Sequence, residues 1–325
     1  MASHAVIDQA ADLLRLYDRD IYQDASEPLK TIQAHYNSWA RVGFETEQPD
    51  ALVAANCLID HIKVMNNKEM AAEKGFISSF IAQPLYIPAS QGLDIVLSHM
   101  PEMPYPQLGV VLVLAGDQPV MQQFYDEAIG INLNMIYAEV KGISHDGARL
   151  SEATDIFKSH VMHGSSYCYL DQVKERFPQK MHDLHWLYPV IFREGFATYV
   201  ETRHHPNHSA YMRDIEIWQD ALHNVAAAAY PSDFRKALRE IRGIGSLTQN
   251  NPKGVETIDQ VLAAKEPLTP YKLLEEIFIL ENGPVNEIGY AMWKTVADKC
   301  GAKEVKDAIK KGPAALVENY QRVKN

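Results

Sequence analysis

Cysteine is scarce in this chain of 325 residues, which contains only three, Cys57, Cys168 and Cys300. They lie far apart, their number is odd, and no two of them form a C-x-x-C pair. Such usage argues against a disulfide framework and is typical of reduced thiols in a cytoplasm. We therefore expect a cytoplasmic protein.

Long hydrophobic runs are also missing. No window approaches the roughly 18 uncharged apolar residues that a membrane span requires. The first 20 residues carry Asp8, Asp12, Asp18 and Asp20 within an amphipathic pattern and have no basic region followed by an apolar core. We therefore expect neither a signal peptide nor a membrane partner.

Positive charge is in deficit. The chain has 31 Lys and Arg against 42 Asp and Glu, which gives a formal net charge of −11 at pH 7. Binding to nucleic acid needs clustered basic side chains that neutralise phosphates, so nucleic acid is not an expected partner. What remains is an ordinary globular composition, 46% hydrophobic and 22% charged, without a low-complexity tract.

The pattern of apolar residues predicts a mostly helical α+β protein. Residues 1–75 read as helical throughout, because apolar side chains recur at steps of three and four. The stretch GVVLVLAGD, residues 109–117, is the clearest strand candidate, since it is short, β-branched and bounded by glycine. The stretch INLNMIYAEV, residues 131–140, alternates and is a candidate to pair with it.

Prolines mark connectors at residues 81–92 and 98–109, and helical patterns return from about residue 148. These observations predict two lobes that join near residues 141–147. Residues 1–145 form a mixed lobe of helices and a small sheet, and residues 146–325 form a helical lobe.

Histidine is unevenly distributed. Nine of the thirteen histidines lie between His145 and His223, and two pairs have the H-x-x-H spacing, His160 with His163 and His182 with His185. Positions i and i+3 are neighbours on a helix, so each pair can present two imidazoles to one metal ion. The isolated histidines elsewhere, His61 among them, are expected to be structural, and the cluster of His204, His205 and His208 is expected to form a polar surface turn.

The stretch REGFATYVE, residues 193–201, places an acid in an apolar helix. Pro189 suits the first turn of this helix, where its missing N–H costs nothing. Glu194 is flanked by apolar residues on most sides, so it is expected to pair with a cation or to bind a metal. Gly195, which follows it, would let another backbone come close.

REGFATYVE closely resembles the second zinc motif of gluzincin metallopeptidases, especially the zinc aminopeptidases. The resemblance extends over roughly residues 150–322 and implies a gluzincin-like helical lobe. It also implies that Glu194 is the third zinc ligand and that Tyr290 supplies the phenol that stabilises the oxyanion.

The upstream half of that zinc site departs from the family. Gluzincins carry H-E-x-x-H, which supplies two ligands and a general base, and this chain has no such motif. In one register residues 159–163, SHVMH, take its place and retain His163 as the second ligand. In the other register residues 156–160, IFKSH, retain only His160. We favour the first, because Val161 and Met162 match the apolar pair expected there.

A metal site of two histidines and one carboxylate follows, with His160, His163 and Glu194 as ligands. Zinc is the expected metal, and iron is an alternative because non-haem iron oxygenases use the same type of ligand set. The motif's base is missing. His182 or His185 is therefore expected to replace one ligand or to serve as the acid or base, since an unperturbed imidazole titrates near neutrality.

Three functions compete on this evidence. The first is a gluzincin-fold metalloenzyme, a peptidase-like hydrolase or a derivative with altered chemistry, acting on a peptide or a small molecule. The second is a metal-free pseudo-peptidase that serves as a binding module. The third is an iron-dependent oxygenase built on the same three ligands.

Overall fold

The computed structural model describes most of the chain, namely residues 6–7, 14–18, 30, 49–105, 107–116, 128–174, 187–201, 214–228, 231–263, 273, 277–278 and 284–324. The chain divides into two compact units, and each is described by itself below. Unit 1 consists of Met1–Ser98 and Glu102–Gln172, and unit 2 consists of His99–Pro101 and Val173–Asn325. The sequence-based boundary at residues 145 and 146 lies inside unit 1.

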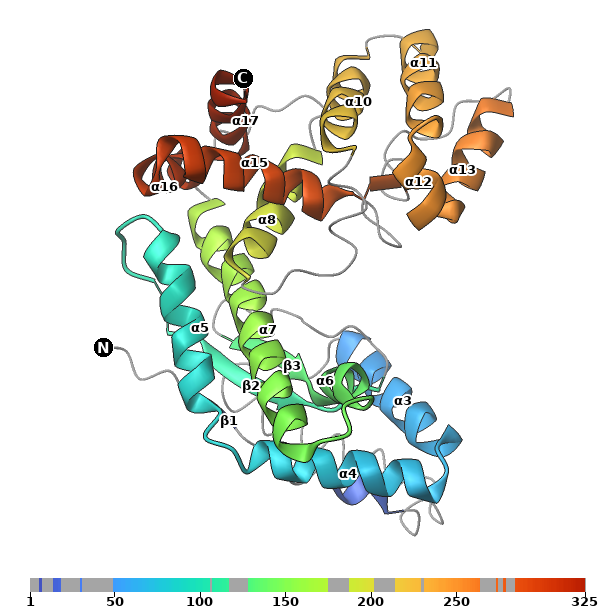
Figure 1. The fold of residues 1–325 in the computed structure, drawn as a ribbon, viewed down its shortest axis with the longest axis vertical. Helices are drawn as coiled ribbons and strands as arrows, with labels where there is room; N and C mark the ends of the chain where they lie inside the picture. Colours follow the sequence, from blue (N-terminus) through green and yellow to red (C-terminus); the bar gives the residue numbers. More distant parts are fainter. Residues whose placement is uncertain are drawn as a thin grey trace. The chain divides into compact units, whose positions relative to one another are not determined.

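Unit 1 contains a small parallel sheet (Figure 1). Its strands are β1 (Val6–Ile7), β2 (Gly109–Val113) and β3 (Ala128–Asn132), in the order β1-β2-β3. Val110 of β2 stands between Val6 and Ile129 in the register, and the described strand residues from Val110 to Val113 are fully or almost fully buried. The prediction of a mostly helical protein with a small sheet is confirmed, and the strand predicted at residues 109–117 forms over residues 109–113.

The second predicted strand, residues 131–140, is wrong over most of its length. β3 ends at Asn132, and helix α6 (Leu133–Val140) follows at once. The reason lies in the Asn132 side chain, which accepts a hydrogen bond from the backbone N–H of Asn134 and so caps the helix. The alternation of apolar residues continues into α6, but this cap turns the chain from strand to helix.

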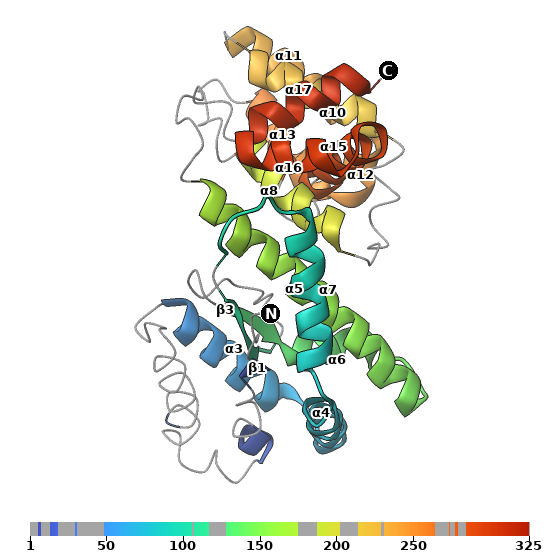
Figure 2. The same cartoon turned by 90° about the vertical axis from the view of Figure 1, so that its left-hand side faces the viewer.

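The other helices of unit 1 surround the sheet (Figure 2). Two stretches differ from the sequence-based expectation. Val6 and Ile7 are a strand within a region predicted to be helical, and the predicted connector at residues 81–92 is helical from Tyr86 onward. The helical elements are η1 (Leu14–Tyr17), α3 (Pro49–Val64), α4 (Asn67–Ile81), α5 (Tyr86–His99) and α7 (Asp146–Lys174).

Small residues and aromatic rings join these helices to the sheet. Gly164 of α7 faces Ile129 of β3 so closely that a Cβ on the glycine would collide with the isoleucine side chain. Phe80 of α4 meets Phe157 of α7 edge-on, with ring centroids 6.1 Å apart. The long helix α7 therefore lies directly on the sheet and closes the core of unit 1.

Unit 2 is helical wherever the structure describes it, apart from short connectors and ends. Gly301 and Gly312 have φ values of +83° and +88°, a conformation that favours glycine, and each separates two successive helices. The helices are α8 (Leu187–Val200), α10 (Ile215–Ala227), α11 (Pro231–Arg242), α12 (Gly245–Asn250), α13 (Pro252–Ala263), α15 (Val285–Cys300), α16 (Ala302–Lys311) and α17 (Pro313–Val323).

Helices α8 and α15 form the most extensive helix contact among the described elements. Gly195 of α8 faces Gly289 of α15, and a Cβ on Gly195 would lie 2.9 Å from the Gly289 carbonyl oxygen and closer still to its Cα. The indole N–H of Trp293 donates to the carbonyl of Phe192 at 3.0 Å. The sequence-based expectation that Gly195 admits another backbone is confirmed, and Pro189 lies in the first turn of α8 as expected.

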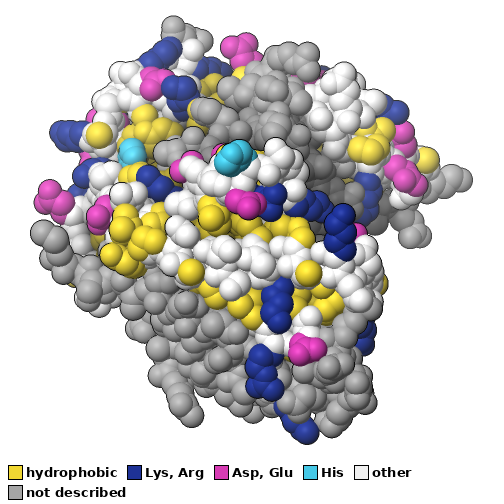
Figure 3. Space-filling model, turned by 60° about the horizontal axis from the view of Figure 1, so that its bottom comes forward, with side chains coloured by type: hydrophobic (Ala, Val, Ile, Leu, Met, Phe, Trp, Pro, Cys, Tyr) yellow, Lys and Arg dark blue, Asp and Glu magenta, His cyan; other side chains and the backbone are white. Residues whose placement is uncertain are grey.

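Within the described part of the chain, no helix is both long enough and apolar enough to cross a membrane. Figure 3 shows acidic, basic and apolar side chains interspersed over the described part of one face. Among the described residues, the most exposed large apolar side chain is Val64, at the end of α3, where 83% of the surface is accessible.

Candidate functional site

The residues predicted from the sequence fall on three helices. His160 and His163 lie on α7 within unit 1, whereas Glu194 on α8 and Tyr290 on α15 belong to unit 2. Neither unit by itself therefore contains the whole predicted set. The other two predicted residues, His182 and His185, lie outside the described residues.

Both histidines of α7 have polar neighbours within unit 1. His160 is buried, and its Nε2 lies 3.8 Å from Oε1 of Glu139 on α6. Nε2 of His163 lies 2.5 Å from the hydroxyl of Tyr167, one turn further along α7, and the two rings meet edge-on. Neighbours of this kind orient an imidazole, which is also what partners of metal-bound histidines do.

Glu194 and Tyr290 lie on the two helices that pack through Gly195 and Gly289. Each directly adjoins one of these glycines, and each is partly exposed although its helix is largely buried. Burial raises the pKa of Tyr199, in the last turn of α8, and the carboxylate of Asp298 raises it further. Tyr290 adds a smaller contribution in the same direction. The α8–α15 pair therefore brings two phenols into electrostatic range of each other.

A search of the described residues finds no group of three or more His, Cys, Asp or Glu side chains that could hold a metal ion. The donor types themselves suit zinc, since imidazole nitrogen and carboxylate oxygen are its common ligands. A two-histidine set at i and i+3 would need its carboxylate from another element.

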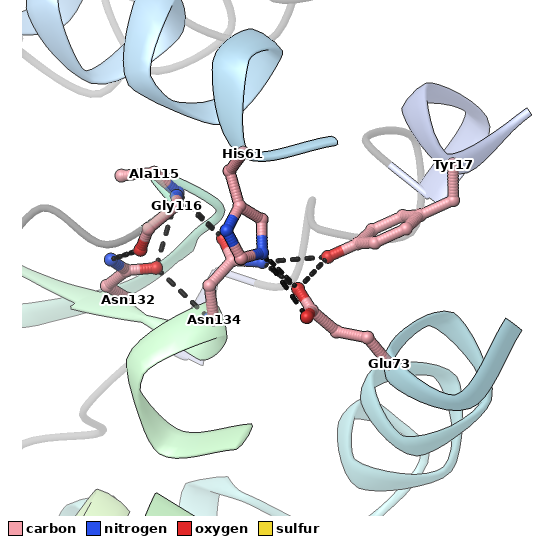
Figure 4. A network of polar contacts seen from close by, with 7 residues as sticks. All are labelled: Tyr17, His61, Glu73, Ala115, Gly116, Asn132 and Asn134. Atoms are coloured by element: carbon pink, nitrogen blue, oxygen red, sulfur yellow. Dashed lines mark hydrogen bonds and ion pairs between the residues drawn. The ribbon is translucent and has the colours of Figure 1, made fainter. Parts of the chain in front are cut away.

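The structure also assembles a polar cluster that the sequence did not predict, here called the Glu73 network (Figure 4). It consists of Tyr17 from η1, His61 from α3, Glu73 from α4, and Asn132 and Asn134 from the end of β3 and the start of α6. Each of these residues comes from a different part of unit 1. The network therefore ties together three α-helices, a short 3-10 helix and the end of the sheet.

Glu73 is the centre of this network, and only 2% of its surface is accessible. Its carboxylate accepts a hydrogen bond from the Tyr17 hydroxyl at 2.6 Å and another from the side-chain amide of Asn134. Nε2 of His61 lies 3.1 Å from Oε1 and 3.3 Å from Oε2. Three donors therefore surround one buried carboxylate, which is how a protein stabilises a charge that it removes from water.

The asparagines connect Glu73 to the backbone at the carboxyl ends of β2 and β3. Oδ1 of Asn134 accepts from the N–H groups of Ala115 and Gly116, at 2.9 and 3.0 Å. Asn132 returns a bond from its amide nitrogen to the carbonyl of Gly116 at 3.0 Å. Open α/β folds bind ligands at the carboxyl end of a parallel sheet. Here the backbone groups after β2 instead form hydrogen bonds with the side chains of Asn132 and Asn134.

The sequence offered one partial signal for this network. Asn132 and Asn134 follow an apolar strand, which is an unusual place for two amides. His61, by contrast, was expected to be an isolated structural histidine, because nothing near it in sequence marks a partner. His61 and Glu73 are 12 residues apart in the sequence, and Asn134 and Tyr17 are 117 residues apart. Only the folded chain brings them together.

Glu287 is a further buried acid, on the first turn of α15. Its surface is 6% accessible, and burial raises its pKa to about 7. A carboxyl group that titrates near neutral pH can serve as an acid or a base. It lies on the same helix as Tyr290, one turn earlier.

Comparison with known proteins adds no relative: family models, curated proteins and solved structures were all searched, and no significant match to this chain was found. A functional assignment therefore depends on the motif in α8 and on the geometry described above.

Proposed function

We propose that this chain is a metal-dependent, peptidase-like hydrolase in which His160, His163 and Glu194 bind zinc. The observation that carries the proposal is the position of Glu194. It lies in the REGFATYVE stretch, partly exposed, directly before the glycine through which α8 packs against α15. That packing holds the helix backbone in place, so the carboxylate has a rigid support of the kind that a metal ligand needs.

The imidazoles of α7 support the proposal through their neighbours. Glu139 and the Tyr167 hydroxyl lie beside ring nitrogens of His160 and His163, and such partners fix the orientation of a ligating ring and leave the other nitrogen to the metal. A zinc ion bound by the three residues would polarise a substrate carbonyl and lower the pKa of a bound water.

The remaining roles fall to groups that can donate or accept a proton. His182 and His185 are the proposed acid and base, and Tyr290 is the proposed donor to the oxyanion. A phenol placed on α15, next to the contact between Gly289 and α8, would face a reaction centre at Glu194 from a second helix. The proposed substrate is a peptide or a small molecule with a scissile carbonyl group.

A second function, a metal-free binding module of the pseudo-peptidase type, is favoured by one observation. The ring nitrogens of His160 and His163 already lie beside Glu139 and the Tyr167 hydroxyl. In that case the histidines stabilise unit 1, and the chain has lost the chemistry of the motif.

Metal analysis of the protein, purified without an affinity tag, separates the two functions. We expect one zinc per chain in the wild type, loss of zinc in Glu194→Gln, and retention of zinc in Glu201→Gln. Glu201 is the matched control, because it is partly exposed and lies seven residues further along the same segment. Circular dichroism of each variant checks that the fold is intact.

Peptide hydrolysis that is abolished by a chelator and restored by zinc would support the hydrolase. Iron in place of zinc would redirect the proposal to an oxygenase of the two-histidine, one-carboxylate type. A folded protein without a bound transition metal, and with Glu194→Gln indistinguishable from the wild type, would refute the metal site and favour the binding module.

A further inference from the structure

We propose that the Glu73 network is a pH-sensitive lock in which the protonated side chain of His61 holds α3 against the rest of unit 1. This inference does not depend on the proposed metal site, because the network shares no residue with it. It rests on the burial of one carboxylate and on the identity of its partners.

The lock depends first on how the charge of the Glu73 carboxylate is balanced. Glu73 is almost fully buried, and a buried carboxylate without a compensating charge is costly. Its partners Tyr17 and Asn134 are neutral donors, so they hydrogen-bond the carboxylate but do not balance its charge. Of the described basic side chains, His61 alone lies within ion-pair distance of Glu73. The charge balance of the network therefore depends on a proton that a histidine can lose near neutral pH.

Other titratable groups lie around the pair of Glu73 and His61. The pKa of Tyr137, on α6, is raised first by burial and then by the negative charge of Glu73, with a smaller contribution from Glu69. Arg149 of α7 acts on Tyr137 in the opposite direction. Around the pair, then, η1 contributes Tyr17, α4 contributes Glu69, α6 contributes Tyr137 and α7 contributes Arg149. None of the four is a basic group in contact with Glu73. Among the described residues, the charge of Glu73 is therefore balanced by His61.

The lock depends second on the segments that His61 contacts besides α4. Gly116, three residues after the end of β2, has a φ of +60° and lies against α3. A Cβ on this glycine would lie 2.8 Å from the carbonyl oxygen of Cys57 and 2.9 Å from Cβ of His61. The backbone at Gly116 in turn is bonded to Asn134 and Asn132. His61 therefore stands where α3, the strand end and Glu73 meet.

The direction of the pH effect follows from these contacts. When His61 is protonated, the pair forms a charge-assisted hydrogen bond inside a buried site, which is stronger than the neutral one. When the pH rises and His61 loses its proton, the buried carboxylate keeps only neutral donors. The closed form of α3 is then less favoured, and α3 separates from the strand ends more often.

Nuclear magnetic resonance of the full chain tests whether the charge of Glu73 stabilises protonated His61. The Cε1–H resonance of His61 is followed from pH 5 to pH 9 in the wild type and in Glu73→Gln, which keeps the shape of the side chain and removes its charge. We expect the midpoint of the His61 transition to lie at least one pH unit higher in the wild type. Equal midpoints in the two proteins would overturn the proposal.

Hydrogen exchange tests whether protonated His61 holds α3 in place. Protection factors of α3 amides, corrected for the intrinsic pH dependence of exchange, should fall about tenfold across the His61 transition in the wild type, since a one-unit displacement is a tenfold change in population. In His61→Gln, which cannot be protonated, they should not change with pH. His223→Gln, an exposed histidine of α10, is the matched control and should behave like the wild type. Protection of α3 that does not change with pH in the wild type would refute the lock, whatever the midpoint of His61.

Discussion

Replacement of Gly195 by alanine tests the most tightly packed contact in unit 2. In an exposed helix interior this change is favourable by about 1 kcal/mol, because alanine has the higher helix propensity. At Gly195 the new methyl group would lie 2.9 Å from the carbonyl oxygen of Gly289, and its Cα and carbonyl carbon are nearer still. These are backbone atoms of a helix, so no side-chain rotation can relieve the overlap.

The helices must therefore move apart, which loosens the contacts that depend on their spacing. The indole of Trp293, bonded to the Phe192 carbonyl at 3.0 Å, packs against the rings of Phe192 and Phe196, with centroids 5.0 and 5.2 Å away. Overpacking of a core costs about 1–3 kcal/mol and sometimes more. We take the upper end because both partners are backbone. After the gain in propensity, the expected net loss in the free energy of opening is about 2 kcal/mol.

The matched control is Gly75→Ala in α4. Gly75 also lies inside a helix, but it is exposed, and a Cβ there would meet nothing within 4 Å. This variant should gain about 1 kcal/mol. Hydrogen exchange of peptides from α8, α15 and α4 measures the free energy of local opening in each variant. A Gly195→Ala protein as stable as the wild type, or stabilised like the Gly75 variant, would refute the close approach of α8 and α15.

Three further features of the fold are tested by four variants, with urea denaturation or hydrogen exchange as the measurement. Burial raises the pKa of Glu287 to about 7, so the folded chain keeps a proton that the unfolded chain releases above about pH 4.5. The free energy of unfolding should therefore fall by about 3 kcal/mol between pH 4.5 and a pH above 7. Glu287→Gln should abolish this pH-dependent contribution. Asn66→Ala removes the capping box that Asn66 forms with Glu69 at the start of α4, and local stability of α4 should fall by about 1 kcal/mol; unchanged exchange of α4 would contradict the cap. Trp218→Phe removes the 2.9 Å bond to the Ser246 hydroxyl and should cost about 1–2 kcal/mol, whereas Ser246→Ala with Trp218 intact should leave the indole N–H without that acceptor at a similar cost.

The elements that the sequence predicted well are those whose signal is local. The strand at residues 109–113 is a run of valine and leucine that begins at a glycine, and the helix start at residues 187–189 is marked by Pro189. The close approach at Gly195 was also readable, because a glycine inside an apolar helix has few other uses. In each case neighbouring residues in the chain contain the physical cause.

Residues 131–140 and 86–92 show where local signals mislead. An alternating apolar pattern suits either a strand or a short buried helix, and the side chain of Asn132 decides between them by capping α6. A proline in a predicted connector is equally at home in the first turn of a helix, and Pro88 lies in the first turn of α5. Patterns of apolar residues alone do not separate these cases.

What the sequence by itself determined is the helical character of the chain, its strand at β2 and the motif around Glu194, since periodicity, propensity and spacing along the chain are enough for these. What only the tertiary structure decided is which polar groups meet. Tyr17, His61, Glu73 and Asn134 come from four elements, and their contacts span up to 117 residues. A buried carboxylate requires donors wherever the fold can supply them, and which donors those are depends on packing that brings distant segments together.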